Sequence, residues 1–519
     1  MSKLLKYITA CILVALASAA ASHAHSAELA GTWATVPTEA AAGSDLYVFR
    51  HHNGAWSGFY RSEFGDVQLR NIAVNGKSLS FDAFLDLGLA PTPPPPIKIR
   101  GFIVRDQIRL VVPAIGGEAR IRILRRANSG EKGQNGDTPA PSSASSLSPL
   151  PYNGLAQTPP MGWNSWNKFQ LKADDSVIRQ IADAIVKTGL REAGYVYVNI
   201  DDGWQGQRDA VGVIHSNERY PDMKALGQYI HSLGLNFGIY SSPGPKTCGG
   251  FEGSYQHEEQ DAKTYAQWGV DYLKYDWCSA ASLYDTPAEM QAAYLKMGTA
   301  LRGTGRPIVY ALCQYGLFDV GQWGRAVGAN LWRTTFDIWD RWRELERIGF
   351  NQDGNVDYAG PGGWNDPDML EIGNGGMTLE EYRTHFTLWS MLSAPLLLGN
   401  DVKNMSDDTR ALLLNKDVIA IDQDALGKQA VRVSRQGKLD ILSKPLEGGD
   451  VAVAFFNHAT TPETIGVLWS DIGVAGVSAV RDLWSQKDLD EPMFRQRYQS
   501  VVPPHGTVLL RVKIDGRPS

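Results

Sequence analysis

The sequence predicts a (β/α)8 TIM barrel with a C-terminal antiparallel β-sandwich and an extra small N-terminal all-β domain. Residues 152–428 alternate eight short apolar segments with helical or loop segments, the order of a parallel barrel. Residues 28–126 and 429–519 show the period-two alternation of antiparallel strands. Residues 127–151 are rich in Ser, Pro and Gly without periodicity, which predicts a linker before the barrel.

Length and charge limit the classes of partner. A chain of 519 residues is too long for one ordinary domain, so two or three domains are expected. The formal charge of −6 and the pI near 6.0 argue against nucleic acid or an anionic membrane as the main partner. The sequence has no basic tract that could follow a phosphate backbone.

The N-terminus resembles a secretory signal peptide, predicted to span residues 1–27. Lys3 and Lys6 precede an apolar run of small residues, and cleavage after Ala24 or after Ala27 satisfies the small-residue rule. We therefore expect an exported protein, periplasmic or extracellular, with no membrane attachment after cleavage. An oxidising compartment permits disulfides. Cys11 leaves with the signal, and an odd number of three cysteines then suits one disulfide and one free thiol.

The small N-terminal domain is predicted from hairpin signals. Asn-Gly pairs at residues 53–54 and 75–76 lie between alternating segments. The domain contains no constellation of catalytic residue types, so structural support is its simplest role and sugar binding is the alternative.

The barrel prediction depends on eight strand candidates. In chain order these are MGWNSW, YVYVNIDDGW, LNFGIYSS, VDYLKYDWC, PIVYALCQYG, ANLWRTTFDIW, GGWNDPDML and APLLLGND. Helical patterns such as DSVIRQIADAIVKTGLREA separate them. An open doubly wound sheet is the alternative, but no Gly-x-Gly-x-x-Gly lies between a strand and a helix to favour it.

Polar and aromatic residues recur at the C-terminal ends of these strands, where barrel active sites lie. They are Trp163, Trp166, Asp201, Asp202, Trp204, Tyr240, Lys274, Asp276, Cys313, Gln314, Tyr315, Arg333, Asp337, Trp364, Asp366, Asp368, Asn400 and Asp401. A single aspartate at a strand end is usually a helix cap or an ion-pair partner. Packing alone does not explain why polar and aromatic residues recur at the same end of nearly every strand. Asp366 precedes a proline, so a role in shaping the turn explains this residue as well as a role in the chemistry does.

Strand parity indicates the chemistry of two carboxylates. Lys274 and Asp276 are two residues apart and therefore share a face. A neighbouring cation favours the charged form of Asp276, which suits a nucleophile. Asp337 needs a drier setting to hold a proton, and Phe336 and Trp339 lie near it in sequence. Two carboxylates with separated pKa values are what glycoside hydrolysis requires.

The same segments resemble a known family over residues 158–425, and more weakly over the C-terminal β-domain. The segments are TPPMGWNSWNKF, NIDDGW, GIYSSPGPKTCGGFEGSY, WGVDYLKYDWC, LWRTTFDI and GPGGWNDPDMLEIGNGG. They look like the α-galactosidases (melibiases) of glycoside hydrolase family 27. The resemblance implies an exo-acting, retaining hydrolase that releases terminal α-D-galactose from oligo- or polysaccharides. It implies neither a metal nor an organic cofactor, and it makes no prediction of oligomeric state.

The resemblance also implies roles for individual residues. Asp276 resembles the nucleophile and Asp337 the acid/base. The implied substrate-binding residues are Trp166, Asp201, Asp202, Tyr240, Cys248, Lys274, Gln314, Arg333 and Asp368. Within this set Asp201 and Asp202 resemble the pair that accepts from O4 and O6 of galactose, and Lys274 and Arg333 resemble donors to ring hydroxyls. Cys248 and Cys278 resemble a family disulfide, which leaves Cys313 free.

Departures from the family pattern leave alternatives open. Gly203 stands where some members carry a cysteine, so only one disulfide is expected. Gln314 faces the 2-substituent of the sugar in the family, and its size argues against an N-acetyl group. Phe336 replaces a smaller residue beside the acid. β-L-Arabinopyranosidase and α-N-acetylgalactosaminidase are therefore the alternatives on the same scaffold, although Asp201, shorter than a Glu, disfavours the former. A non-catalytic carbohydrate-binding protein is the third.

Overall fold

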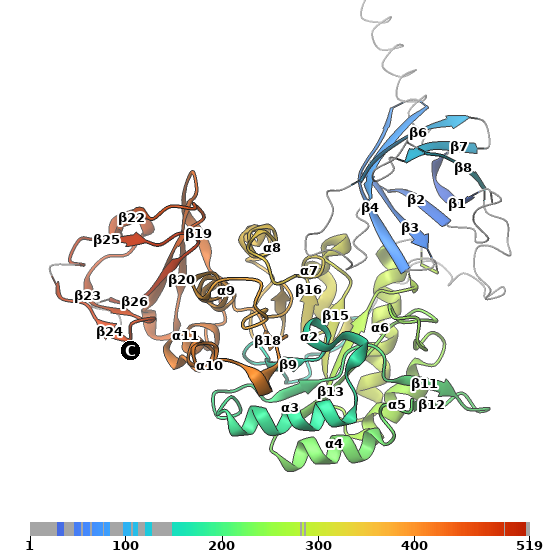
Figure 1. Cartoon of the computed structure of the whole chain (residues 1–519), viewed down its shortest axis with the longest axis horizontal. Helices are drawn as coiled ribbons and strands as arrows, with labels where there is room; N and C mark the ends of the chain where they lie inside the picture. The colour runs from blue at the N-terminus through green and yellow to red at the C-terminus, as the bar shows by residue number, and fades with distance from the viewer. Residues whose placement is uncertain are drawn as a thin grey trace, which may run out of the picture. The chain divides into compact units, whose positions relative to one another are not determined.

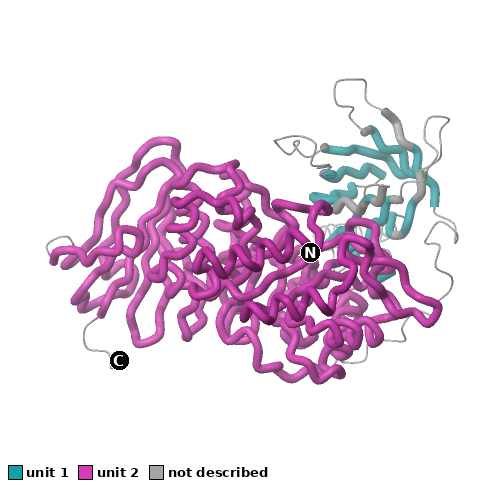
Figure 2. Tube along the Cα trace, turned by 60° about the horizontal axis from the view of Figure 1, so that its bottom comes forward, with its two compact units in different colours: residues 1–143, 278–285 teal, residues 144–277, 286–519 magenta. Residues whose placement is uncertain are grey.

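The structure is a computed structural model. It describes residues 148–280, 283–284, 287–491 and 494–514. In the N-terminal part it describes residues 29–35, 46–52, 55–62, 65–75, 77–83, 97–104, 107–112 and 120–126. The predicted signal peptide and most of the predicted linker lie outside these ranges. The chain forms two compact units, residues 1–143 with 278–285, and residues 144–277 with 286–519 (Figure 2).

The larger unit is built on eight parallel strands (Figure 1). They are β9 (Met161–Asn164), β10 (Tyr197–Asn199), β13 (Asn236–Ser241), β14 (Tyr272–Asp276), β15 (Val309–Cys313), β16 (Leu331–Arg333), β17 (Trp364–Asp366) and β18 (Leu396–Leu398). Their order is β17-β16-β15-β14-β13-β10-β9-β18. A parallel bridge between Leu370 and Leu398 joins the two ends of this order. The (β/α)8 prediction is thereby confirmed, and the open-sheet alternative is wrong.

Helices follow the strands and lie outside them. They are α2 (Trp166–Phe169), α3 (Asp175–Lys187), α4 (Met223–Ser232), α5 (Glu258–Trp268), α6 (Pro287–Gly303), α7 (Val320–Trp323), α8 (Trp342–Ile348), α9 (Leu379–Leu392), α10 (Asp407–Leu413) and α11 (Lys416–Asp422). In α3 the Asp174 side chain caps the N-terminus by accepting from Val177 N, and Ile178, Ile181 and Ile185 bury one face. Among the described helices, none combines the length and apolarity needed to cross a bilayer.

Shorter elements complete this part of the chain. A hairpin of β11 (Gln205–Arg208) and β12 (Ile214–Ser216) follows β10. The 3-10 helices are η1 (Gln170–Lys172), η3 (Leu317–Asp319), η4 (Gly324–Val327), η5 (Gly349–Asn351), η6 (Asp353–Asn355), η7 (Val402–Asn404), η8 (Glu447–Gly449) and η9 (Trp469–Ile472).

The barrel interior is packed below its mouth. Its central cluster comprises Tyr272, Val309, Ala311, Leu331, Met369 and Leu397. Close strand packing depends on Gly162 of β9, because a Cβ there would lie 2.4 Å from the carbonyl oxygen of Tyr197 on β10. The filled interior leaves the polar strand ends as the place where a ligand can bind.

The C-terminal part forms the predicted antiparallel β-sandwich. One sheet has the order β19-β20-β21-β26-β23-β24, and β22 pairs with β25. The bounds are β19 (Val431–Gln436), β20 (Leu439–Pro445), β21 (Val451–Asn457), β22 (Glu463–Leu468), β23 (Val477–Asp482), β24 (Lys487–Asp488), β25 (Arg497–Val502) and β26 (Thr507–Ile514). Lys444 of β20 connects this sandwich to the barrel helices, because its Nζ donates to the carbonyls of Ser390 and Ile421 and to Ser393 Oγ.

The N-terminal unit contains eight antiparallel strands that close on themselves. They are β1 (Gly31–Thr35), β2 (Leu46–His52), β3 (Ala55–Ser62), β4 (Gly65–Asn75), β5 (Ser78–Ala83), β6 (Ile97–Val104), β7 (Gln107–Val112) and β8 (Arg120–Arg126). The two Asn-Gly signals fall at the β2–β3 and β4–β5 hairpins, where His52 pairs with Ala55 and Asn75 with Ser78. Trp33, Phe49 and Phe81 belong to the core that fills it.

Candidate active site

The barrel mouth brings most of the predicted site residues into one hydrogen-bonded system. Asp276 ends β14 and is buried, with 4% of the residue exposed. Its Oδ1 accepts from the Trp277 backbone N–H and from Tyr315 Oη, each at 2.7 Å. Its Oδ2 accepts from Tyr240 Oη at 3.1 Å. Burial raises the pKa of Asp276, and Lys274 and the Tyr315 hydrogen bond partly offset that rise.

Lys274 lies on the same face of β14, as strand parity predicts. Its ion-pair partner is Asp201, with Nζ 2.8 Å from Oδ2. The same oxygen accepts from Asn164 Nδ2 at 2.8 Å. Burial opposes the charged form of Lys274, but Asp201 and other carboxylates outweigh it and raise its pKa. Lys274 is therefore a fixed cation in the pocket, and it influences Asp276 through space rather than as its paired ion.

Asp202 is held separately from Asp201. Its Oδ2 accepts from the Gly249 backbone N–H at 2.6 Å. Its Oδ1 is buried and has no hydrogen-bonding partner among the described residues. Burial raises the pKa of Asp202 to about 7, and the hydrogen bond from the Gly249 backbone N–H limits the rise. An acceptor in this state suits a sugar hydroxyl that would satisfy the open oxygen.

Asp337 occupies a different setting, because its side chain is 49% exposed. Arg333 Nη2 lies 2.9 Å from Asp337 Oδ1, and Arg333 Nη1 lies 3.2 Å from Asp368 Oδ1. The dry setting expected for Asp337 is therefore not found. Phe336 stacks on Tyr315 instead of covering the carboxylate.

The remaining predicted residues border this system. Gln314 is fully buried, its Oε1 accepts from Gly316 N at 2.8 Å, and its Nε2 has no partner among the described residues. Trp166 packs against the central barrel cluster. Cys248 Sγ lies 3.8 Å from Tyr315 Oη. The predicted disulfide is present, because Cys248 and Cys278 are both disulfide-bonded, and Cys313 is free and buried.

A small cavity marks the floor of the site. Its lining comprises Asn164, Tyr272, Lys274, Ala311, Leu312, Cys313, Arg333, Asp366, Asp368, Met369 and Leu397. Asp366 therefore lines the cavity as well as shaping the turn, where its Oδ1 accepts from Asp368 N at 2.8 Å. Burial raises the pKa of Asp366 to about 6 and raises that of Asp368. Asn164 could have been found as a polar residue at the C-terminal end of a strand, whereas Met369 carried no sequence signal.

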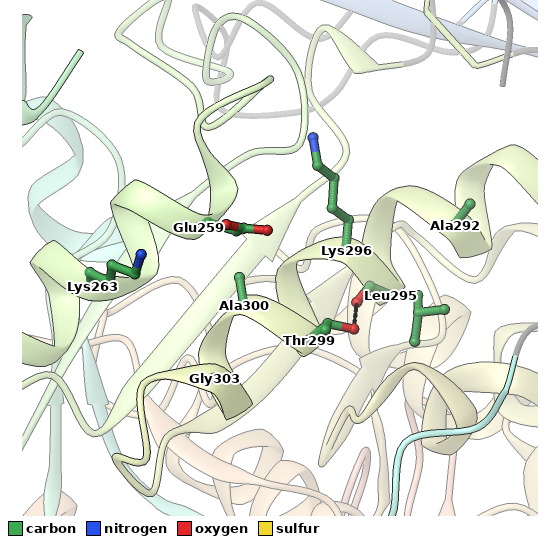
Figure 3. A pocket seen from close by; sticks show the side chains of 8 residues that line it. All are labelled: Glu259, Lys263, Ala292, Leu295, Lys296, Thr299, Ala300 and Gly303. Atoms are coloured by element: carbon green, nitrogen blue, oxygen red, sulfur yellow. Dashed lines mark hydrogen bonds between the residues drawn. The ribbon is translucent and has the colours of Figure 1, made fainter. Parts of the chain in front are cut away.

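A larger hollow lies elsewhere, as a groove of about 560 Å³ between α5 and α6 (Figure 3). Glu259 and Lys263 of α5 and Lys296 of α6 line it. It contains none of the predicted site residues, so volume alone does not identify the chemistry.

One grouping of potential metal ligands includes Asp276. Among the residues described, Cys248, Asp276 and Cys278 place candidate ligand atoms within 4.8 Å of one another. The two sulfurs are bound in a disulfide. Cysteine binds a metal ion as the thiolate, and a sulfur in a disulfide is not a thiolate. This grouping therefore offers a metal only the Asp276 carboxylate.

Comparisons with known proteins agree with this geometry. The family profile described as Alpha galactosidase A matches residues 158–424, and that of the Alpha galactosidase C-terminal beta sandwich domain matches residues 436–512. The chain belongs to the α-galactosidase family. The family resemblance seen in the sequence is thereby confirmed.

Individual members of the α-galactosidase family match over most of their length. The α-galactosidase of Cyamopsis tetragonoloba is 47% identical over 341 residues, which cover 64% of this chain and 82% of that protein. The crystal structure of α-galactosidase I from Mortierella vinacea aligns with a TM-score of 0.66 and 37% identity, covering 71% of this chain and all of that chain. A β-L-arabinopyranosidase from Geobacillus stearothermophilus aligns at 26% identity with a TM-score of 0.63, covering 69% and 97%.

Proposed function

We propose that this chain is an exo-acting, retaining α-galactosidase that releases terminal α-D-galactose from oligo- or polysaccharides. One observation carries the proposal: an α-galactosidase-family barrel places two aspartates of unlike environment at its mouth. Asp276 is buried and held by three donors, and Asp337 is half-exposed. Unlike surroundings are what separate a nucleophile from an acid/base.

The two aspartates divide a double displacement between them. A carboxylate oxygen of Asp276 attacks the anomeric carbon and forms a glycosyl ester, while Asp337 gives its proton to the departing glycosidic oxygen. Asp337 then takes a proton from water as that water attacks the same carbon, and the ester bond to Asp276 breaks. Two inversions give net retention. Because Asp337 is half-exposed, the leaving group can depart from it after the first step and a water molecule can take its place before the second.

Galactose recognition is assigned to the polar groups around the nucleophile. Asp201 and Asp202 supply carboxylate oxygens for O4 and O6, and an acceptor pair can select the axial hydroxyl that glucose lacks. The Lys274–Asp201 ion pair fixes one of these carboxylates in place. The unpartnered Nε2 of Gln314 supplies a donor beside the pocket, which suits a hydroxyl at C2.

A comparison of three nitrophenyl glycosides tests the specificity. The α-D-galactoside should have the highest kcat/KM, ahead of the β-L-arabinopyranoside and the α-N-acetylgalactosaminide. The relative of higher identity is named an α-galactosidase, whereas the arabinopyranosidase aligns at only 26% identity. A higher kcat/KM on either alternative substrate would refute the proposed specificity.

Replacement of the nucleophile tests the mechanism. Asp276→Ala should abolish turnover, whereas Asp408→Ala, at an exposed aspartate of α10, should leave it unchanged. Retention of near-normal activity by the Asp276 variant would exclude it as the nucleophile.

We also propose that the chain is exported. The charged and apolar N-terminal pattern supports this, as does a disulfide between cysteines that would remain after cleavage. Expression from the native N-terminus, followed by mass measurement of the secreted product, tests it. A product that retains residues 1–24 in the cytoplasm would contradict export.

A further inference from the structure

The loop after β15 holds an unusual run of backbone conformations beside the nucleophile. Tyr315 has φ 63°, Gly316 has φ 78°, and Phe318 and Asp319 have φ 53° and 51°. Bulky side chains rarely adopt this left-handed region, which costs roughly 1–2 kcal/mol for a residue with a Cβ. Such conformations persist where surrounding contacts hold them, and they gather at functional sites.

Tyr315 is the member of the run that reaches the reacting groups. Its hydroxyl donates to Asp276 Oδ1 at 2.7 Å. Its ring stacks on Phe336 with centroids 5.1 Å apart and planes 5° apart. The Arg333 guanidinium lies 5.8 Å from the ring centroid. Burial raises the pKa of Tyr315 well above its ordinary value, so its hydroxyl keeps its proton and acts as a donor.

The contacts of Tyr315 make the two oxygens of Asp276 unequal. Oδ1 accepts two hydrogen bonds of 2.7 Å, from Tyr315 Oη and from the Trp277 backbone N–H. Oδ2 accepts one hydrogen bond of 3.1 Å from Tyr240 Oη. An oxygen with two short donors has less free electron density to offer a carbon than one with a single long donor.

We propose that Tyr315 is a positioning residue that commits Asp276 to attack through Oδ2, and that holds Oδ1 as the carbonyl oxygen of the glycosyl ester. The inference rests on the proposed function. In the first step the Oδ2–C1 bond forms and the C1–oxygen bond of the leaving group breaks, with the proton coming from Asp337. In the second step water adds to C1, its proton goes to Asp337, and the Oδ2–C1 bond breaks.

The second step is where the Tyr315 hydroxyl acts most. The departing carboxylate regains its negative charge, which spreads over both oxygens. A donor already aimed at Oδ1 stabilises that charge without reorganisation, as an oxyanion-hole donor does. In the first step the same hydrogen bond stabilises the attacking carboxylate before reaction, so it offers less net acceleration. Loss of the hydroxyl should therefore slow breakdown of the glycosyl-enzyme more than its formation.

The stack with Phe336 gives the tyrosine a fixed place. Phe336 directly precedes Asp337, so the stack connects the loop after β15 to the loop carrying the acid/base. Parallel rings at this distance restrict rotation of the tyrosine side chain. This contact, together with the left-handed backbone, explains how a hydroxyl from a loop keeps a 2.7 Å hydrogen bond to a strand residue.

The test compares Tyr315→Phe with Tyr310→Phe. Tyr310 lies on β15 and its buried hydroxyl donates to the Tyr294 carbonyl at 3.0 Å, so its replacement controls for losing a buried hydroxyl that does not touch Asp276. With nitrophenyl α-galactoside, Tyr315→Phe should lower kcat about 10-fold to 100-fold, as expected for one hydrogen bond to a charged group. KM should fall in parallel, so that kcat/KM changes much less.

Rapid mixing supplies the decisive readout. Tyr315→Phe should release a burst of about one nitrophenol per enzyme, because the glycosyl ester accumulates when its breakdown is slow. Phe336→Leu keeps the hydroxyl but removes the stack, and should show the same change in kcat and KM more weakly. Tyr310→Phe should behave as wild type.

Two results would overturn the inference. One is wild-type kcat and KM for Tyr315→Phe. The other is an equal fall of kcat and kcat/KM without a burst, which would place the hydroxyl's effect on ester formation. Failure of the proposed function is separate, since it would appear as a wild-type enzyme that prefers another glycoside. The burst experiment can then be run on that glycoside.

Discussion

Glu371 offers a direct test of the electrostatics around the barrel mouth. Its side chain is 2% exposed and lies just after β17. Asn374 Nδ2 donates to Glu371 Oε2 at 2.7 Å, and Asn167 donates to Oε1. Burial raises the pKa of Glu371 to about 8, and the neighbouring Asp340 and Asp368 add to the rise against the two amide hydrogen bonds.

The raised pKa makes folding stability fall as pH rises. The folded state holds a proton on Glu371 that the unfolded chain, with an ordinary value of 4.5, releases much earlier. The stabilisation is fully present below about pH 4.5 and is lost as pH rises through about 8. At ~1.4 kcal/mol per pKa unit, the difference between these two values has an upper limit of about 5 kcal/mol.

Glu371→Gln removes this dependence while keeping the side-chain shape. The buried Oδ1 of Asn374 has no partner among the described residues, so an amide flip would let it accept from the new glutamine in exchange for the hydrogen bond that Nδ2 donates to the Gly399 carbonyl. We expect a melting temperature near wild type at pH 5 and several degrees above wild type at pH 8.5. A large domain shifts by roughly 2–4 °C or less for each kcal/mol.

Thermal scanning from pH 5 to pH 9 measures the effect. Glu259→Gln, at an exposed glutamate of α5, is the control and should follow wild type throughout. A Glu371→Gln melting curve that differs from wild type by the same amount at every pH would refute the reasoning. It would show that Glu371 is charged in the folded protein and that its hydrogen bonds offset the free-energy cost of burying this charge.

Three further predictions concern buried contacts. Lys444→Met should lower the free energy of unfolding by about 1–3 kcal/mol in chemical denaturation, because three buried acceptors lose their donor. Arg333→Met should cut kcat/KM at least about 100-fold with nitrophenyl α-galactoside, since it unpairs Asp368 at the pocket floor; activity within a factor of three would contradict this. Gly162→Ala should reduce soluble yield and melting temperature, because the new Cβ meets the carbonyl of the adjacent barrel strand at 2.4 Å.

The sequence by itself determined the elements and their faces. Eight apolar segments separated by helical patterns predicted the barrel strands, because helix and strand periods differ and are set by local geometry. Asn-Gly pairs predicted two hairpins, because few residue pairs adopt the backbone that such turns require. Parity on β14 correctly placed Lys274 and Asp276 on one face, since side chains two apart on a strand point the same way. The family motifs supplied the proposed roles.

Tertiary structure decided which of these side chains meet. Lys274 pairs with Asp201, 73 residues away, although Asp276 is its neighbour in sequence. Tyr315 reaches Asp276 from the next strand only because β14 and β15 pair in register, with Asp276 opposite Cys313. Asp337 is half-exposed, while its neighbour Phe336 stacks on Tyr315. Local patterns fix the face of a residue, but its partners depend on strand register and loop conformation, which long-range packing sets.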